Sequence, residues 1–453
     1  MQSLYTIFNQ ESIGGYLCRY FSRYFLGSTK PMADILCGLL LSMLVMESAP
    51  SIRCLHRHFK SSLMQHSLNS YYRACKKETA VDDIVLKRHV LQQALKIVPK
   101  ALWKEPVFMC VDDTTVAKAG KSFENVTILH DHAMHTGKLY VNGHCFVSLT
   151  LCVPVYAQGK GSQQRIRYVG LPIGYTMWTK EKTKLEIAAE MVNAAMEELH
   201  GKQVFLECDS WYAKKSFISA VIHHENLNLI CNARVDSAIY ELPPAKTGRR
   251  GRPAKRGAKL SLEDFKCDYQ WGKYHVGCRK VMTNIFGDKS VYAYLTATDS
   301  GSKRLFFSTA APATIHMSCA WQENDDLRNT GSKDMMVLPL KLYSFRWQIE
   351  VAYYEQKTFW SLGKYMIRRK CGIERLLNLI NIAHASMRLL PYLDDRFAHY
   401  KDSSPQELRF ELSRQINDEL FLATLTSRVK TGINSEEANN LLKILADSCF
   451  TAA

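Results

Sequence analysis

The amino-acid sequence predicts a mixed α/β fold with helical regions at both ends and a β-rich insertion. Apolar residues recur at steps of three and four in about the first 100 residues and again after about residue 336, which is typical of amphipathic helices. Between these regions, neighbouring apolar strands are followed by strand–helix alternation, which favours a mixed sheet. The 453 residues are 47% hydrophobic, so a large core can be buried and two or three domains are expected.

Residues 1–100 are predicted to form a helical, DNA-binding domain. The apolar run Ile35–Met46 is shorter than the roughly 20 residues needed to span a bilayer, and is therefore expected to be a buried core helix. The basic stretch 48–77 contains two Ser-rich breaks and is compatible with a helix-turn-helix-like DNA reader. A helical bundle with a basic surface explains this stretch equally well.

Residues 101–236 are predicted to form the first part of the α/β core. The segment 106–118 is expected to be a short strand that ends in acidic residues, and 203–224 is expected to be a strand-to-helix unit with another acid at the strand's end. Further strands are predicted at 143–157, 164–178 and 227–235, and an amphipathic helix at 182–200.

Residues 237–335 are strand-rich and lack the helical repeat, so they are predicted to be an insertion into the core. Residues 336–395 would complete the core with a long helix that begins near Leu338. Residues 396–453 are predicted to be a helical C-terminal region.

The charge balance points to a polyanionic partner. The 59 Lys and Arg residues exceed the 43 Asp and Glu residues by 16, which favours nucleic acid or an anionic membrane surface. The sequence has no apolar run long enough for a membrane span and no signal-peptide pattern at its start. The fourteen cysteines form no C-x-x-C pair and are expected to be reduced, mostly buried thiols in a cytoplasmic protein. These features exclude membrane and secreted proteins and leave nucleic acid.

Three acidic residues are candidates for a catalytic site. Asp113 and Asp209 stand at predicted strand ends, where catalytic groups collect in α/β sheets, and Glu350 lies in a helical segment. Taken singly, each is explained as well by an exposed surface position, because most acidic residues are exposed.

Four polar side chains share one stripe of the predicted helix that contains Glu350. At 100° per residue, Tyr343, Arg346, Glu350 and Lys357 fall within an arc of about 60°. This composition is wrong for a hydrophobic core, although a solvated row of ion pairs would also produce it. The functional interpretation is a metal-binding acid beside two cations and a phenol that hold phosphate.

Together, the segments VDDTTVAK and LECDSWYAKK and the pattern Y-x2-R-x3-E-x6-K resemble the DDE transposases of bacterial insertion sequences, in particular the insertion sequence four family. The resemblance covers about residues 105–390 and implies an RNase H-like catalytic core. It implies that Asp113, Asp209 and Glu350 are catalytic and hold two Mg²⁺ ions, for which Mn²⁺ can substitute. The family places the first acid directly before a Thr, which selects Asp113 over Asp112, a neighbour expected to point away from the site.

The resemblance also implies a reaction and its partners. A cut-and-paste transposase nicks the inverted-repeat ends of its element, forms and reopens a hairpin, and joins the freed 3′ ends to target DNA. It would work as a homodimer in a synaptic complex, on bacterial DNA in the cytoplasm. Hairpin formation needs an unstacked base against an aromatic ring, for which Trp321 and Trp347 are candidates, although Trp321 is explained as well by packing.

A second DNA contact is predicted in the basic segment 246–259 of the insertion. Its Arg-Gly-Arg-Pro core resembles an AT-hook, which lies in a narrow minor groove. A basic hairpin tip that touches phosphates anywhere is the alternative. The candidate DNA-binding residues of this segment are Arg249, Arg250, Arg252, Lys255 and Arg256.

Two other functions remain open. One is a DNA-binding protein derived from a transposase that has lost cleavage. The other is a metal-dependent DNA nuclease without strand transfer, because three acids do not distinguish cleavage from joining.

Overall fold

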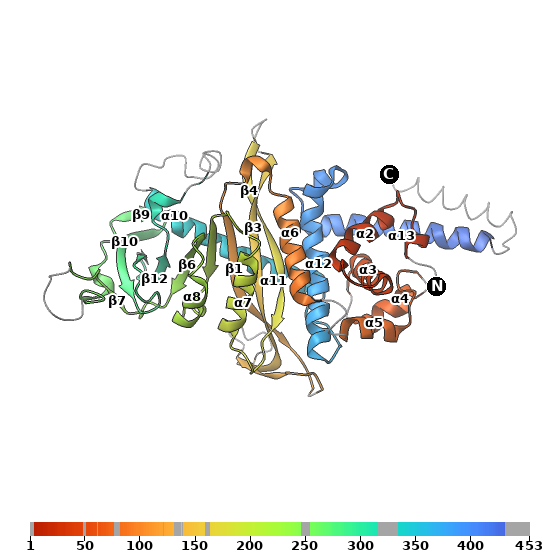
Figure 1. Cartoon of the computed structure of the whole chain (residues 1–453), viewed down its shortest axis with the longest axis horizontal. Helices are drawn as coiled ribbons and strands as arrows, with labels where there is room; N and C mark the ends of the chain where they lie inside the picture. Colours follow the sequence, from red (N-terminus) through yellow and green to blue (C-terminus); the bar gives the residue numbers. More distant parts are fainter. Residues whose placement is uncertain are drawn as a thin grey trace.

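The computed structural model describes residues 4–48, 51–60, 62–76, 82–120, 122–130, 137, 139–158, 164–245, 254–315, 317 and 334–430. A large sheet occupies the middle of the elongated molecule, and a helical region that contains the first and the last described helices lies at one side (Figure 1). The strand-rich segment lies at the opposite side. The predicted α/β fold is therefore confirmed at the level of class.

Short helices make up the amino-terminal region. The apolar run predicted as a core helix is confirmed, because every residue from Ile35 to Val45 is buried. This helix, α3, packs against α2, α5, α12 and α13, so helices from the amino-terminal and carboxy-terminal regions share one core. The elements of this region are α1 (Leu4–Ile7), α2 (Ile13–Ser22), η1 (Arg23–Phe25), α3 (Lys30–Val45), α4 (Ile52–Phe59), α5 (Leu68–Lys76), α6 (Asp83–Lys96) and η2 (Lys100–Leu102).

In the described residues one twelve-stranded sheet runs in the order β2-β3-β1-β5-β6-β12-β11-β10-β7-β8, with β4 beside β3 and β9 beside β10. Strands β1, β5 and β6 are parallel to one another, and the other neighbouring pairs are antiparallel. The strands and helices of the core are β1 (Val107–Ala117), β2 (Thr127–His130), β3 (Tyr140–Gln158), β4 (Gln164–Met177), α7 (Lys184–Met196), β5 (Val204–Cys208), α8 (Lys215–Val221) and β6 (Leu227–Ala233).

The strand-rich segment extends the same sheet, because β12 pairs antiparallel with β6. Its elements are β7 (Ile239–Tyr240), β8 (Lys259–Leu260), η3 (Leu262–Asp264), β9 (Tyr269–Trp271), β10 (Tyr274–Thr283), β11 (Val291–Thr298), β12 (Lys303–Ser308) and η4 (Pro312–Thr314).

The predicted long helix near Leu338 is interrupted. It consists of α10 (Asp334–Leu342), a 3-10 turn η6 (Tyr343–Arg346) and α11 (Trp347–Phe359). The chain then continues through α12 (Lys370–Leu393), η7 (Asp395–Tyr400) and α13 (Pro405–Lys430). None of the helices in the described residues has the length and apolar character required for a membrane span.

Strand β1 continues past the acids at which it was expected to end. Val111 pairs with Leu149, Asp112 with Ser148 and Asp113 with Val147, all within the ladder with β3. Successive side chains of a strand point to opposite faces of the sheet. Asp112 and Asp113 therefore face opposite sides, and this difference determines the site.

Candidate active site

Two aspartates lie side by side on one face of the sheet. Cys208, the last residue of β5, pairs with Val111 of β1, so the next residue of each strand, Asp209 and Asp112, is also adjacent and on the same face. The Asp209 Oδ1 accepts hydrogen bonds from the backbone N–H groups of Trp211 at 3.0 Å and Tyr212 at 3.2 Å, which fix the turn after β5. The prediction that Asp209 follows its strand is confirmed.

Burial and the negative charge of neighbouring acids disfavour the ionised forms of these two acids. Burial, followed by the negative charge of Asp209, raises the pKa of Asp112 to about 7. Burial also raises the pKa of Asp209 above its ordinary value, against the two backbone hydrogen bonds that lower it. A cation between them would relieve both effects.

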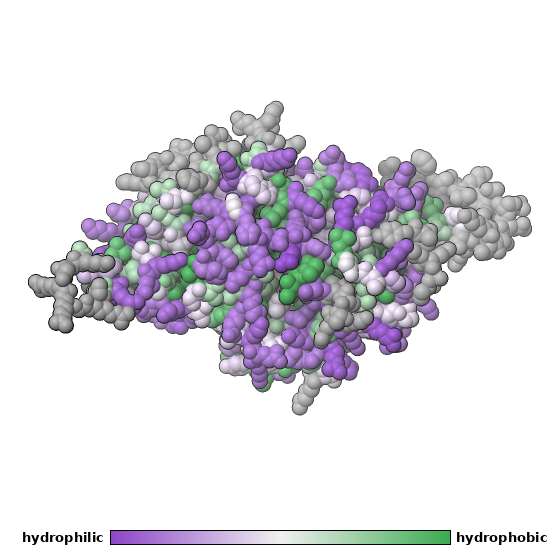
Figure 2. Space-filling view, in the orientation of Figure 1, coloured by the Kyte–Doolittle hydropathy of each residue, from purple (hydrophilic) through white to green (hydrophobic). Residues whose placement is uncertain are grey.

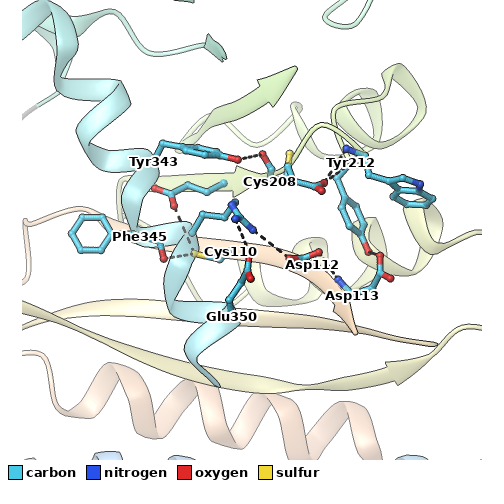
Figure 3. A network of polar contacts seen from close by, with 12 residues as sticks. Cys110, Asp112, Asp113, Cys208, Tyr212, Tyr343, Phe345 and Glu350 are labelled. Atoms are coloured by element: carbon cyan, nitrogen blue, oxygen red, sulfur yellow. Dashed lines mark hydrogen bonds and ion pairs between the residues drawn. The ribbon is translucent and has the colours of Figure 1, made fainter. Parts of the chain in front are cut away.

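Arg346 joins Asp112 to the third acid. Its Nη1 lies 3.3 Å from Oδ2 of Asp112, and its Nη2 donates to Oε1 of Glu350 at 2.7 Å (Figure 3). Glu350 stands in the first turn of α11, one turn beyond Arg346. Arg346 thus contacts two carboxylates directly, and its positive charge also lowers the pKa of the remaining acid, Asp209.

The interrupted helix positions this cluster. Tyr343, the first residue of η6, donates its hydroxyl to the Cys208 carbonyl at 3.2 Å, so it holds the end of β5 (Figure 3). The expectation of a single helical stripe is therefore only partly right, because Tyr343 and Arg346 belong to the 3-10 turn. Lys357 lies two turns after Glu350 on the same face of α11.

Asp113, the residue favoured by the sequence, faces the other side of the sheet. Its two carboxylate oxygens lie 3.0 and 2.9 Å from the Lys184 Nζ, and it accepts hydrogen bonds from the Tyr212 hydroxyl at 2.9 Å and the Cys145 thiol at 3.0 Å. The expectation that Asp112 points away from the site is wrong. The alternation of side chains along β1 brings Asp112 to Arg346 and, through it, to Glu350, while the charge of Asp113 still raises the pKa of Asp209.

A buried acid lies in β5 beneath the cluster. Glu207 lies two residues before Asp209, is completely buried, and its Oε2 is 3.8 Å from the Cys110 thiol. Burial raises its pKa well above the ordinary range, so the side chain is neutral. The same thiol also lies 3.3 Å from the Phe345 carbonyl of η6, and the Phe345 ring stacks on Phe108 with centroids 4.2 Å apart. These contacts seat η6 on β1 and β5.

The other predicted DNA-binding residues lie elsewhere. Lys255 pairs with Asp288 at 2.7 Å, and Arg256 lies over the Tyr240 ring, 4.4 Å from its centroid, so both are bound within the strand-rich segment. Trp347, at the start of α11, is 61% exposed beside Arg346. The remaining candidates fall outside the described residues: Arg249, Arg250, Arg252 and Trp321.

The chemistry of the cluster fits a hard divalent cation, because the atoms that could bind a metal ion are carboxylate oxygens. In the described part of the chain, however, no three acidic, histidine or cysteine side chains stand close enough together to hold a metal ion in the present arrangement. Arg346 now bridges Asp112 and Glu350, so metal binding would require these side chains to rearrange.

Comparison with protein families identifies the chain. A family model described as DDE superfamily endonuclease matches residues 29–280, more than half of the sequence, including Asp112 and Asp209. The chain belongs to the DDE superfamily endonucleases. Among solved structures, this DDE endonuclease resembles a piggyBac transposase synaptic complex with hairpin DNA, with 10% identity and a TM-score of 0.45 over 98% of this chain and 85% of the other. The comparison with curated proteins finds no match.

Sequence reasoning considered Asp112 and set it aside, and it missed three residues of the endonuclease that lie near the acids: Lys184, Trp211 and Tyr212. Asp112 was recoverable from the sequence, because a strand that extends to Ala117 alternates its side chains through both aspartates. The position of Lys184 beside Asp113 depends on how α7 packs on β3, and that of Tyr212 on the turn after β5; sequence periodicity specifies neither.

Proposed function

We propose that this DDE endonuclease is a DNA transposase of the insertion sequence four type, which cleaves the ends of its element and joins the 3′ ends to target DNA. The observation that carries the proposal is that Arg346 bonds to Asp112 and Glu350 and that its charge also lowers the pKa of Asp209, so one cation links three acids. Three carboxylates beside a guanidinium suit phosphodiester chemistry, in which metal ions and cations offset the charge on phosphate oxygens.

We propose that Asp112, Asp209 and Glu350 hold two Mg²⁺ ions, or Mn²⁺ in their place, with Asp112 in the role that the sequence assigned to Asp113. Ions bound there would supply an activated water and stabilise the leaving oxygen. The raised pKa of Asp112 favours this assignment, because burial and a neighbouring acid make its carboxylate dependent on a counter-charge. Asp113 already has Lys184 as its counter-charge.

The protein's own residues would orient the DNA. Arg346 is placed to move between its two carboxylates and a DNA phosphate when the acids receive cations. Tyr343 keeps the end of β5, and with it Asp209, against η6. Lys357 would contact phosphate further along α11, and Trp347 offers an exposed ring near the scissile position.

The proposed catalytic core is RNase H-like. It comprises the strands in the order β4-β3-β1-β5-β6 together with α11, and the acids come from β1, the end of β5 and α11. The helical region of residues 1–100 would bind DNA, and the protein would act as a homodimer on inverted-repeat ends in the bacterial cytoplasm. The excess of 16 positive charges agrees with a polyanionic substrate. The face shown in Figure 2 is largely hydrophilic.

The test is strand cleavage of labelled DNA that carries the flanking ends of the gene, with Mg²⁺ or Mn²⁺. Asp112→Asn, Asp209→Asn and Glu350→Gln should each lower cleavage by at least about a thousandfold, because each removes one metal-binding charge. Asp113→Asn is the matched control, with the same change one residue away, and should keep cleavage within about tenfold. Loss of cleavage in Asp113→Asn with normal cleavage in Asp112→Asn would refute the assignment.

The products distinguish the other two functions. Cleaved ends that join to a target plasmid support the transposase. Metal-dependent cleavage without joined products would instead identify a nuclease. Specific binding of the ends without cleavage in either metal would identify a DNA-binding derivative. Binding of Mn²⁺, measured by its electron paramagnetic resonance signal in wild type and Asp112→Asn, tests the metal site without reference to activity.

A further inference from the structure

A cavity lies between the sheet and three helices, and none of the residues that line it belongs to the acid cluster. Helix α6, which stands between the sheet and α12, contributes one wall (Figure 1). Helix α7, the start of α12 and the strands β3 and β4 contribute the rest. The volume is about 310 Å³, which is in the range of small-molecule sites in proteins. At about 30 Å³ for each water-sized group, the cavity holds a molecule of about ten non-hydrogen atoms.

Most of the cavity lining is apolar. The apolar side chains come from α6, β3, β4 and α7, and they include Leu91, Leu149, Ile173, Ile187, Met191 and Ala194. Covering such a surface with an apolar group is favourable in proportion to the area removed from water. The lining therefore favours a ligand whose body is a hydrocarbon.

One ammonium group stands in this apolar lining. Lys87 of α6 donates from its Nζ to the Thr176 Oγ1 of β4 at 2.5 Å. Its stem lies against β4 because residue 174 is a glycine, where a Cβ would come within 2.7 Å of the Lys87 Cγ. In the described part of the chain, no carboxylate lies within ion-pair distance of this Nζ. Burial lowers the pKa of Lys87, because an ammonium removed from water without a counter-charge is unfavourable.

The acidic side chains around the cavity already have partners. Three of them pair with cations: Glu190 with Lys182 at 2.5 Å, Glu198 with Arg88 at 3.2 Å and Asp83 with Arg375 at 3.5 Å. The fourth, Glu374, accepts a hydrogen bond from the Met177 N–H at 2.7 Å, and burial raises its pKa. The charge of Glu374 acts on Lys87 from beyond ion-pair distance. Lys87 is thus placed to receive an anion from the cavity.

We propose that this cavity binds a small carboxylic acid in its anionic form, with a hydrocarbon body of about eight carbons. The carboxylate accepts hydrogen bonds from the Lys87 ammonium and the Thr176 hydroxyl, and the hydrocarbon covers the apolar lining. Octanoate has the size that the cavity holds. The site is independent of DNA and of the acids, and because its ligand contacts α6, α7 and α12 together, binding stabilises the folded chain.

The test is binding of octanoate to the full-length protein without metal or DNA, measured by isothermal titration calorimetry. The uncharged 1-octanol and the cationic octylamine are probes of equal chain length. We expect octanoate to bind at least about tenfold more tightly than either, because a charge-assisted hydrogen bond forms only with the carboxylate. Lys87→Met should abolish this preference. Lys96→Met makes the same change at an exposed position of α6 outside the cavity, and this matched control should bind octanoate as wild type does.

A second variant tests the cavity with the lysine intact. Ala194→Phe fills the space beside α7 and should lower the affinity for octanoate at least about tenfold. Octanoate should raise the melting temperature of wild type and Lys96→Met but not that of Ala194→Phe. Absence of octanoate binding to wild type, equal affinities for octanoate and 1-octanol, or tighter binding of octylamine would each overturn the proposal. Unchanged octanoate binding in Ala194→Phe would also overturn it, because the ligand would then be bound elsewhere.

Discussion

Neutralising Glu355 should destabilise the fold by an amount that depends on pH. Glu355 lies on α11 and accepts hydrogen bonds from the His384 Nε2 and the Arg388 Nη2, each at 2.7 Å. Burial lowers the pKa of His384, so this ring is neutral and the charge partner of Glu355 is Arg388. Burial acts to raise the pKa of Glu355, but the hydrogen bond from His384 and the charge of Arg388 outweigh it and lower the pKa from 4.5 to about 2.

The lowered pKa sets the size of the effect and the pH range in which it appears. A carboxyl group whose pKa is lower in the folded state stabilises the fold above its unfolded pKa, and this stabilisation is lost as the pH falls through the folded pKa. At about 1.4 kcal/mol per unit, the shift corresponds to about 3 kcal/mol at pH 7 and about half of that at pH 3. Glu355→Gln keeps the shape and removes the charge, so it should lose about this amount.

Native-state hydrogen exchange of the α11 and α12 amides measures the free energy of opening where the pair is located. The difference between wild type and Glu355→Gln should stay nearly constant from pH 7 to about pH 5 and then fall to about half by pH 3. Glu190→Gln is the control, because Glu190 pairs with Lys182 on the surface with both side chains more than half exposed. It should change stability by less than about 0.5 kcal/mol. A Glu355→Gln deficit that is the same at pH 7 and pH 3 would refute the electrostatic explanation.

Two further predictions follow from buried and basic groups. Arg409 donates to the carbonyls of Met43, Leu44 and Phe359. Arg409→Met should leave these acceptors unpaired and lower the free energy of unfolding, measured by urea denaturation, by about 3 kcal/mol. A loss below about 1 kcal/mol would contradict this. Deletion of 246–259 should reduce the slope of log K for DNA against log salt by about four units, and an unchanged slope would remove this segment from the interface.

The sequence predicted helices correctly where a local pattern of residues determines them. The core helix α3 was recognisable because its apolar run is continuous and too short for a membrane. The helix α7 begins at a capping box in which Thr183 and Glu186 bond to each other's backbone N–H groups, a signal that is local in sequence. Both predictions depend only on residues within one element.

The predictions that failed concern how elements end and meet. Helical spacing alone placed Tyr343 and Arg346 on the same helix as Glu350, but the chain tightens to a 3-10 turn there. The hydroxyl of Tyr343 then reaches the end of β5, and the Cys110 thiol lies against the Phe345 carbonyl. These are contacts between segments that are more than 100 residues apart, and no spacing rule within one segment contains them.

The choice between Asp112 and Asp113 shows what a short motif leaves undecided. The motif states only that an acid stands before a Thr. The face on which each acid lies depends on whether its position along the strand is odd or even, and on the register with the next parallel strand. With Val111 opposite Cys208, the residue beside Asp209 is Asp112. Asp113 then becomes available to hold Lys184 and Tyr212, and through them the surroundings of Trp211. Two adjacent aspartates of one strand therefore have different partners: Asp112 pairs with Arg346 on one face of the sheet, and Asp113 pairs with Lys184 on the other.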